Sequence, residues 1–88
     1  MANRVVVQPN GLFARYSDIV DNFTHINCDE KEMFQVYRDE GFGREEANQK
    51  IQRAKADPRR FIEAINDIRN VHGEPEVVKI RAMMESGL

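Results

Sequence analysis

Hydrophobic and polar positions change their spacing along the chain, and the first pattern is that of a β-hairpin. Two β-prone runs, RVVVQ and LFARYS, flank Pro9-Asn10-Gly11. Proline presets φ, and Asn and Gly accept the positive φ that tight turns use. Residues 1–17 are therefore predicted to form an N-terminal β-hairpin. An isolated hairpin is marginally stable in water, so it must pack on helices or pair with a second copy.

Helical spacing begins directly after the hairpin. Ser17 is a suitable N-cap, and Ile19, Phe23 and Ile26 occupy the i, i+4 and i+7 positions of one helix face. The spacing predicts a short helix in this stretch, with Asp18, Asp21 and His25 on its opposite face.

Capping residues and apolar stripes predict four more helices. The first helix starts at the Asp29/Glu32 capping box and ends at Gly41, and the second runs from about Arg44 to Ala56. The third starts at Asp57-Pro58 and ends at Gly73, and the fourth starts near Pro75. Their apolar stripes are Met33, Phe34, Val36 and Tyr37; Ala47, Ile51 and Ala54; Phe61, Ile62, Ile65 and Ile68; and Val77, Ile80 and Met84. The predicted fold class is α+β, mostly α. The N-terminal hairpin packs on a bundle of four or five short helices, which form the helical part 18–88 of a single domain over residues 1–88.

Composition supports one globular domain. The chain has 88 residues, of which 41% are hydrophobic and 32% charged, enough for a single modest core. A single cysteine excludes an internal disulfide, and no apolar run is long enough for a signal peptide or a membrane span. We therefore expect a cytoplasmic protein, in the host cytoplasm if a phage encodes it, that makes no membrane contact.

The stretch THINCDEKE, residues 24–32, concentrates reactive groups. Asp21, His25, Cys28 and Asp29 offer oxygen, nitrogen and sulfur donors within one short segment. Structural zinc sites favour two or more thiolates in paired spacing, which the chain lacks, and a catalytic cysteine needs a histidine held by a third group. The favoured interpretation is that Cys28 is a small packed residue and that His25 pairs with Asp21. We expect no catalytic residue, no bound metal and no cofactor.

The net charge of −2 conceals an uneven distribution. Nine acids and three bases lie in residues 17–48, whereas the basic segment, residues 50–60, holds five bases against Asp57. Those bases are candidate contacts for an acidic protein or for nucleic acid, although a dedicated nucleic-acid binder usually has a basic overall balance. Phe42, in the turn Gly41-Phe42-Gly43, is either an exposed apolar contact or folded back onto the core. The partner-contact candidates are Phe42, Lys50, Arg53, Lys55, Arg59 and Arg60.

Two segments resemble known groups of proteins. EGFGREEANQKIQRAKADPRRFIEAI is similar to ubiquitin-associated (UBA) domains, and the resemblance implies a three-helix unit over residues 29–70. In that comparison Gly41-Phe42 takes the place of the binding loop, Ala47 and Ile51 are core residues of the second helix, and Phe61, Ile62 and Ile65 are core residues of the third. The stretch NGLFARYSDIVDNFT resembles the start of small uncharacterised tailed-bacteriophage proteins. That likeness implies an accessory protein that acts on a host or phage factor.

These observations predict a small non-enzymatic protein-binding regulator or inhibitor, whose partner is another protein. A homodimer through the hairpin edge or the terminal helix is compatible with the same pattern. The alternatives are a nucleic-acid-binding accessory protein that uses the basic segment and a small metal-binding domain.

Overall fold

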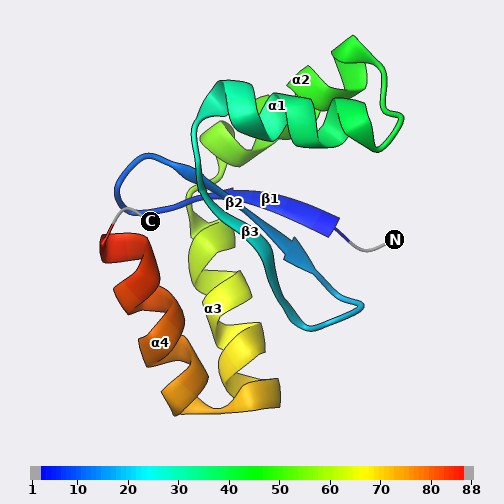
Figure 1. Cartoon of the computed structure of the whole chain (residues 1–88). Helices are drawn as coiled ribbons and strands as arrows, with labels where there is room; N and C mark the ends of the chain where they lie inside the picture. The colour runs from blue at the N-terminus through cyan, green and yellow to red at the C-terminus, as the bar shows by residue number, and fades with distance from the viewer. Residues whose placement is uncertain (1–2, 87–88) are drawn as a thin grey trace.

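The chain folds into a three-stranded antiparallel sheet followed by four helices (Figure 1). The computed structural model describes residues 3–86. Its elements are β1 (Asn3–Val7), β2 (Phe13–Ser17), β3 (Asn22–Cys28), α1 (Glu30–Asp39), α2 (Arg44–Ala56), α3 (Arg59–His72) and α4 (Glu74–Glu85). The predicted α+β class, mostly α, is confirmed, with a third strand in addition to the hairpin.

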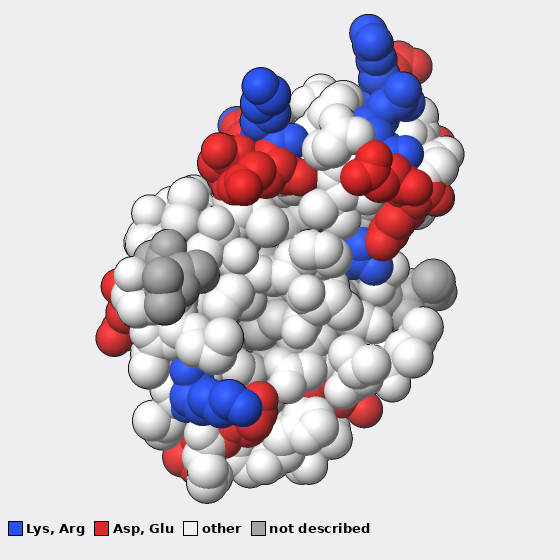
Figure 2. Space-filling view, in the orientation of Figure 1, with Lys and Arg blue, Asp and Glu red and all other residues white. Residues whose placement is uncertain are grey.

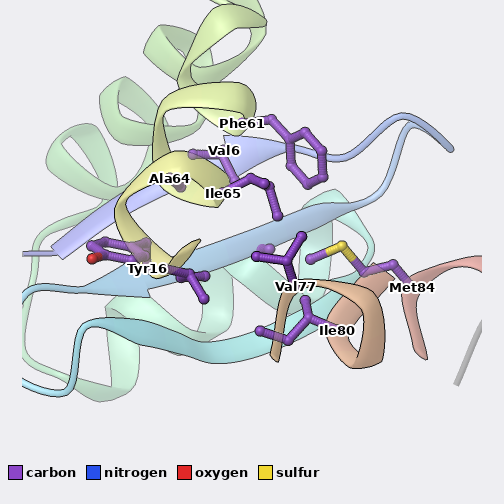
Figure 3. Packing of buried hydrophobic residues seen from close by; sticks show 10 residues of the cluster. Val6, Tyr16, Phe61, Ala64, Ile65, Val77, Ile80 and Met84 are labelled. Carbon is purple, nitrogen blue, oxygen red and sulfur yellow. The ribbon is translucent and has the colours of Figure 1, made fainter. Parts of the chain in front are cut away.

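The sheet lies between two helix pairs rather than on one bundle. α1 and α2 lie side by side on one face, and α3 and α4 lie side by side on the other (Figure 1). Strand residues point alternately to the two faces. Val5 and Phe13 pack with α1 and α2, whereas Val6 and Ala14 pack with α3 and α4. Figure 3 shows the second of these clusters, in which Tyr16 and Val6 of the sheet lie against the apolar side of α3.

The predicted β1–β2 hairpin is confirmed. Val6 pairs with Ala14 at its centre. The N–H of Gly11 donates to the Gln8 carbonyl at 2.9 Å, and the Gln8 N–H donates to the Leu12 carbonyl at 2.8 Å. Gly11 has φ of 87°, a value that a residue without Cβ adopts at no steric cost.

The predicted helix after Ser17 is wrong, because this stretch forms a turn and then β3. Arg15 of β2 pairs with His25 of β3, and the next residue, Tyr16, pairs with Phe23. Thr24 is therefore an extra residue in β3, which forms a β-bulge. The bulge brings Phe23 and Ile26 onto the same face, where both pack against the α3/α4 cluster. Two apolar residues three positions apart therefore imitate helical spacing in a strand.

The capping signals of the later helices are confirmed. Asp29 and Glu32 form the reciprocal capping box of α1, with the Glu32 N–H donating to Asp29 Oδ1 at 2.7 Å. Gly41 follows α1 with φ of 99°. α3 starts at Arg59 with Pro58 as its N-cap, one residue later than Asp57-Pro58 predicts. The Asp57 carboxylate still accepts the Arg59 N–H, at 3.2 Å.

The chain changes faces between α2 and α3, and it does so beside β1. Asp57 and Pro58 alone connect the two helices, although α2 and α3 belong to different buried clusters. Both helices contact β1, which is an outer strand of the sheet. The connection therefore passes the β1 edge, and the helices of residues 29–70 are divided between the two faces of the sheet.

Gly73 is the single residue between α3 and α4, with φ of 90° and ψ of 171°. This conformation is accessible almost only to glycine. We expect Gly73→Ala to lower the free energy of unfolding by about 1–3 kcal/mol, measured by urea denaturation.

Gly43→Ala is the matched control, because Gly43 also precedes a helix but has φ of −69°, and an added Cβ would meet only Glu46 Oε1 at 3.8 Å. Its expected loss is about 0.5–1 kcal/mol, because Gly43 is the N-cap of α2 and alanine is a poorer N-cap than glycine. Equal losses in the two variants would contradict the conformational explanation.

Candidate functional site

In the structure, some cations of the basic segment have a carboxylate partner and others have none among residues 3–86. Lys55 Nζ forms an ion pair with Glu30 Oε1 at 2.6 Å, which joins α2 to α1. Arg59 Nε lies 3.6 Å from Asp57 Oδ1, and the Arg59 side chain is largely exposed. Exposed pairs of this kind add little to stability, but they leave less positive charge to offer to a partner.

Lys50, Arg53 and Arg60 come together at the β1 edge. They line a small pocket of about 100 Å³, together with Asn3, Arg4, Val5 and Tyr37. Two of the three cations lie on α2 and the third lies in the first turn of α3, so the short connection between these helices assembles the pocket. Within residues 3–86, none of the three forms an ion pair with a carboxylate.

Tyr37, from α1, forms part of the pocket wall. The Lys50 ammonium lies 5.5 Å from the centre of its ring, a cation–π arrangement. Its hydroxyl is buried and has no hydrogen-bond partner among the described residues. Burial raises the pKa of Tyr37, while the positive charges of Arg15 and Arg60 act in the opposite direction. The hydroxyl therefore stays a neutral donor without an acceptor.

Two other arginines near the sheet are held by carboxylates. Arg4 Nη2 bonds to Asp67 Oδ2 of α3 at 2.7 Å, and its guanidinium lies 4.6 Å from the Tyr16 ring centre. Burial disfavours the charge of Arg4, yet the hydrogen bond and charge of Asp67 raise its pKa overall. Buried Arg15 forms an ion pair with Glu40, which follows α1. These two arginines fasten the sheet to a helix on each face.

Phe42 is half-buried and folded back. Its ring meets the Tyr37 ring edge to face, with centres 5.5 Å apart, and the Lys50 ammonium lies 4.9 Å from its centre. Phe42 thus supports the position of Lys50 instead of standing out from the turn as an apolar contact.

A second concave region lies at the other end of β1, beside the hairpin turn. It consists of two adjoining hollows of about 260 and 430 Å³ that share Pro9, Phe61 and Arg81. We call it the apolar groove, and its remaining lining residues are Val7, Gln8, Asn10, Pro58, Ile62, Met84 and Glu85. Phe61 and Met84 lie at the same end of the buried cluster in Figure 3.

The groove was missed in the sequence, although one signal for it is visible. Ile62 lies beside the apolar stripe of α3, and the sequence predicts it to be a core residue, but 59% of its surface is exposed. Pro9 and Met84 are far apart in the chain, and only the packing of the hairpin turn against α4 brings them together.

β3 is the other outer strand of the sheet and carries no charged residue. On the face shown in Figure 2, charged side chains gather over α1 and α2 and around α4, with a largely uncharged area between them over β3. Uncharged outer strands can pair with another chain, and charged side chains or proline usually prevent this.

The THINCDEKE stretch holds no metal cluster in the described part of the chain, where no three His, Cys, Asp or Glu side chains converge. His25 lies on β3, and its Nδ1 lies 3.0 Å from the Thr24 hydroxyl. The expected pairing with Asp21 across a helical turn is wrong, since no helix forms. The Cys28 thiol donates weakly to the Ile26 carbonyl at 3.7 Å.

Comparison of the chain with protein-family models, curated proteins and solved structures finds no match. In residues 3–86, no helix is long and apolar enough to cross a membrane.

Burial, together with the negative charges of Glu32 and Asp29, raises the pKa of the Cys28 thiol, the opposite of what an activated nucleophile needs. We expect Cys28 to react with an aromatic disulfide reagent about threefold or more slowly in the folded protein than in concentrated urea, because less thiolate is present. Stopped-flow absorbance at mildly alkaline pH measures both rates.

Asp29→Asn keeps a capping oxygen and removes one of the charges, so its folded-state rate should be intermediate. A faster reaction in the native fold than in urea would show that Cys28 is activated.

Proposed function

We propose that this chain is a non-enzymatic protein-binding module that acts as a regulator or inhibitor by occupying a surface of its partner. The observation that carries the proposal is the apolar groove between the hairpin turn, α3 and α4. An apolar groove can receive an apolar segment of a protein partner.

Hydrogen bonds join the elements that form the groove. The Asn10 amide donates to the Met84 carbonyl at 3.2 Å, which fastens the hairpin turn to the end of α4. Buried Gln8 donates to Asn27 Oδ1 at 2.7 Å and to Asn10 Oδ1 at 3.1 Å. A surface that needs no reordering loses less conformational entropy on binding.

The lining defines the chemistry of the partner segment. Phe61, Pro9 and Ile62 supply apolar contacts, and Arg81 lines both hollows with its guanidinium carbon 5.8 Å from the Phe61 ring centre. Arg81 has no ion-pair partner among residues 3–86. The best-matched partner segment therefore presents an apolar side chain next to a carboxylate.

A homodimer remains a second hypothesis, supported by a different feature. β3 is an uncharged outer strand, so a second copy could extend the sheet there. The N-terminal stretch resembles phage proteins, and we therefore include in the proposal that the partner is a host or phage factor.

Peptides selected from a random display library on the native protein should be enriched in an apolar residue beside Asp or Glu. Ile62→Glu places a charge at the rim of the groove and is expected to weaken the selected peptides by about tenfold or more. Fluorescence polarisation of labelled peptides measures the affinity.

Val71→Glu is the matched control, since Val71 lies on the same helix with 56% exposure but outside the groove. Its expected effect is within about twofold. A library without such enrichment, or peptides that bind both variants equally, would contradict the proposal.

Arg81→Gln tests the second part of the recognition. The variant should weaken acidic peptides by about three- to tenfold, because a charge-assisted contact is lost, and leave their uncharged analogues nearly unchanged. Lys79→Gln, on the same helix but not in the groove lining, serves as the control for net charge. Equal losses for acidic and uncharged peptides would show that Arg81 does not read the carboxylate.

A further inference from the structure

We infer that the pocket at the β1 edge is a binding site for a single phosphate group carried by a small molecule. This phosphate pocket lies apart from the apolar groove, and the two share no lining residue. Its proposed occupant is independent of the protein partner.

All charged residues that line the phosphate pocket are cations. Its lining includes Lys50, Arg53 and Arg60 and no acidic residue, while Arg4 already bonds to Asp67. Three cations without counter-ions repel one another, so holding them around one small space costs free energy. An anion in that space would convert this repulsion into attraction, and guanidinium groups bind phosphate oxygens in a bidentate manner.

The aromatic wall of the pocket favours a cation at this place. The Lys50 ammonium lies 5.5 Å from the Tyr37 ring centre and 4.9 Å from the Phe42 ring centre, so it is held beside the pocket without a carboxylate. At the start of α3 the Asp57 carboxylate already accepts the Arg59 N–H and lies 3.6 Å from the Arg59 guanidinium, whereas Arg60 lines the pocket and has no such partner among residues 3–86. Lys50 and Arg60 therefore offer their charge to a ligand.

The phosphate pocket is large enough for one phosphate group. Its volume of about 100 Å³ is several times the roughly 10–15 Å³ that a single water molecule needs, so it accommodates a tetrahedral oxyanion. Nucleic acid gains affinity from many phosphate contacts along a basic track. Here the neighbouring cations Lys55 and Arg59 are already paired with carboxylates. These observations favour one phosphate group over an extended polyanion.

The test uses the full chain titrated with inorganic phosphate and with glycerol 3-phosphate at constant ionic strength, followed by amide chemical shifts. Shifts are expected at Asn3, Lys50, Arg53 and Arg60. Stronger binding of the ester would mean that the organic part contributes, and equal binding would mean that the free oxyanion suffices. Both results support the site. If neither ligand shows saturable binding, the inference is overturned.

Arg60→Gln and Arg59→Gln form a matched pair, because these neighbours differ in that only Arg60 lines the pocket. Arg60→Gln should weaken phosphate binding by about tenfold, and Arg59→Gln by less than about twofold. Arg53→Gln, at an exposed helix position, should repeat the loss if Arg60→Gln disturbs folding. Equal effects at Arg59 and Arg60 would overturn the inference.

A single-stranded oligonucleotide forms the last arm of the experiment. Oligonucleotide binding that is tighter than that of both small ligands, falls steeply with salt and depends equally on Arg59 and Arg60 would assign these cations to nucleic acid. That result would also overturn the phosphate pocket.

Discussion

The structure depends on a single strand that is buried on both faces. All five residues of β2 are buried, although the strand includes Arg15 and Ser17. Its neighbours on either side are strands, and its faces are covered by separate helix pairs. In a chain of this size, two thin layers of apolar contact replace one large core, and β2 contributes to both. Removing either helix pair would leave half of the strand's side chains in water.

The ion pairs of the sheet follow from the same arrangement of helix pair, sheet and helix pair. Arg4 on β1 and Arg15 on β2 reach opposite helix pairs, where Asp67 and Glu40 neutralise them. A buried guanidinium requires such a partner, because an unpaired charge in the interior is costly. Lys50, Arg53 and Arg60 have no such partner among residues 3–86, yet they line one pocket at the β1 edge. Because these unpaired charges come together in one place, we associate them with a ligand.

Much of the local structure could be predicted from the sequence. The hairpin turn and the capping box of Asp29 and Glu32 are short-range features, in which neighbouring residues determine the backbone conformation. The helix over 44–56 has both a clear stripe and clear ends. β3 could not be identified in this way, because its bulge places Phe23 and Ile26 on the same face at a spacing that a helix also uses. Pairing with β2 decided between the two conformations, and it depends on residues elsewhere in the chain.

The candidate sites were predictable only in part. Lys50, Arg53 and Arg60 were recognised as a basic group, but sequence spacing does not show that Lys55 and Arg59 have carboxylate partners. Those partners depend on how α1 packs against α2 and on the backbone at the α2–α3 connection. The apolar groove depends on contacts between the hairpin turn and the last helix, which are more than seventy positions apart.

The order of the layers along the chain has a consequence for synthesis on the ribosome. The sheet and the first helix pair are complete by Ala56, whereas the second pair follows only after Pro58. Until that pair has left the exit tunnel, Val6, Ala14 and Tyr16 have no helices to cover them. The nascent chain therefore passes through a stage in which one face of the sheet is open, and residues 59–85 close it once they have left the exit tunnel.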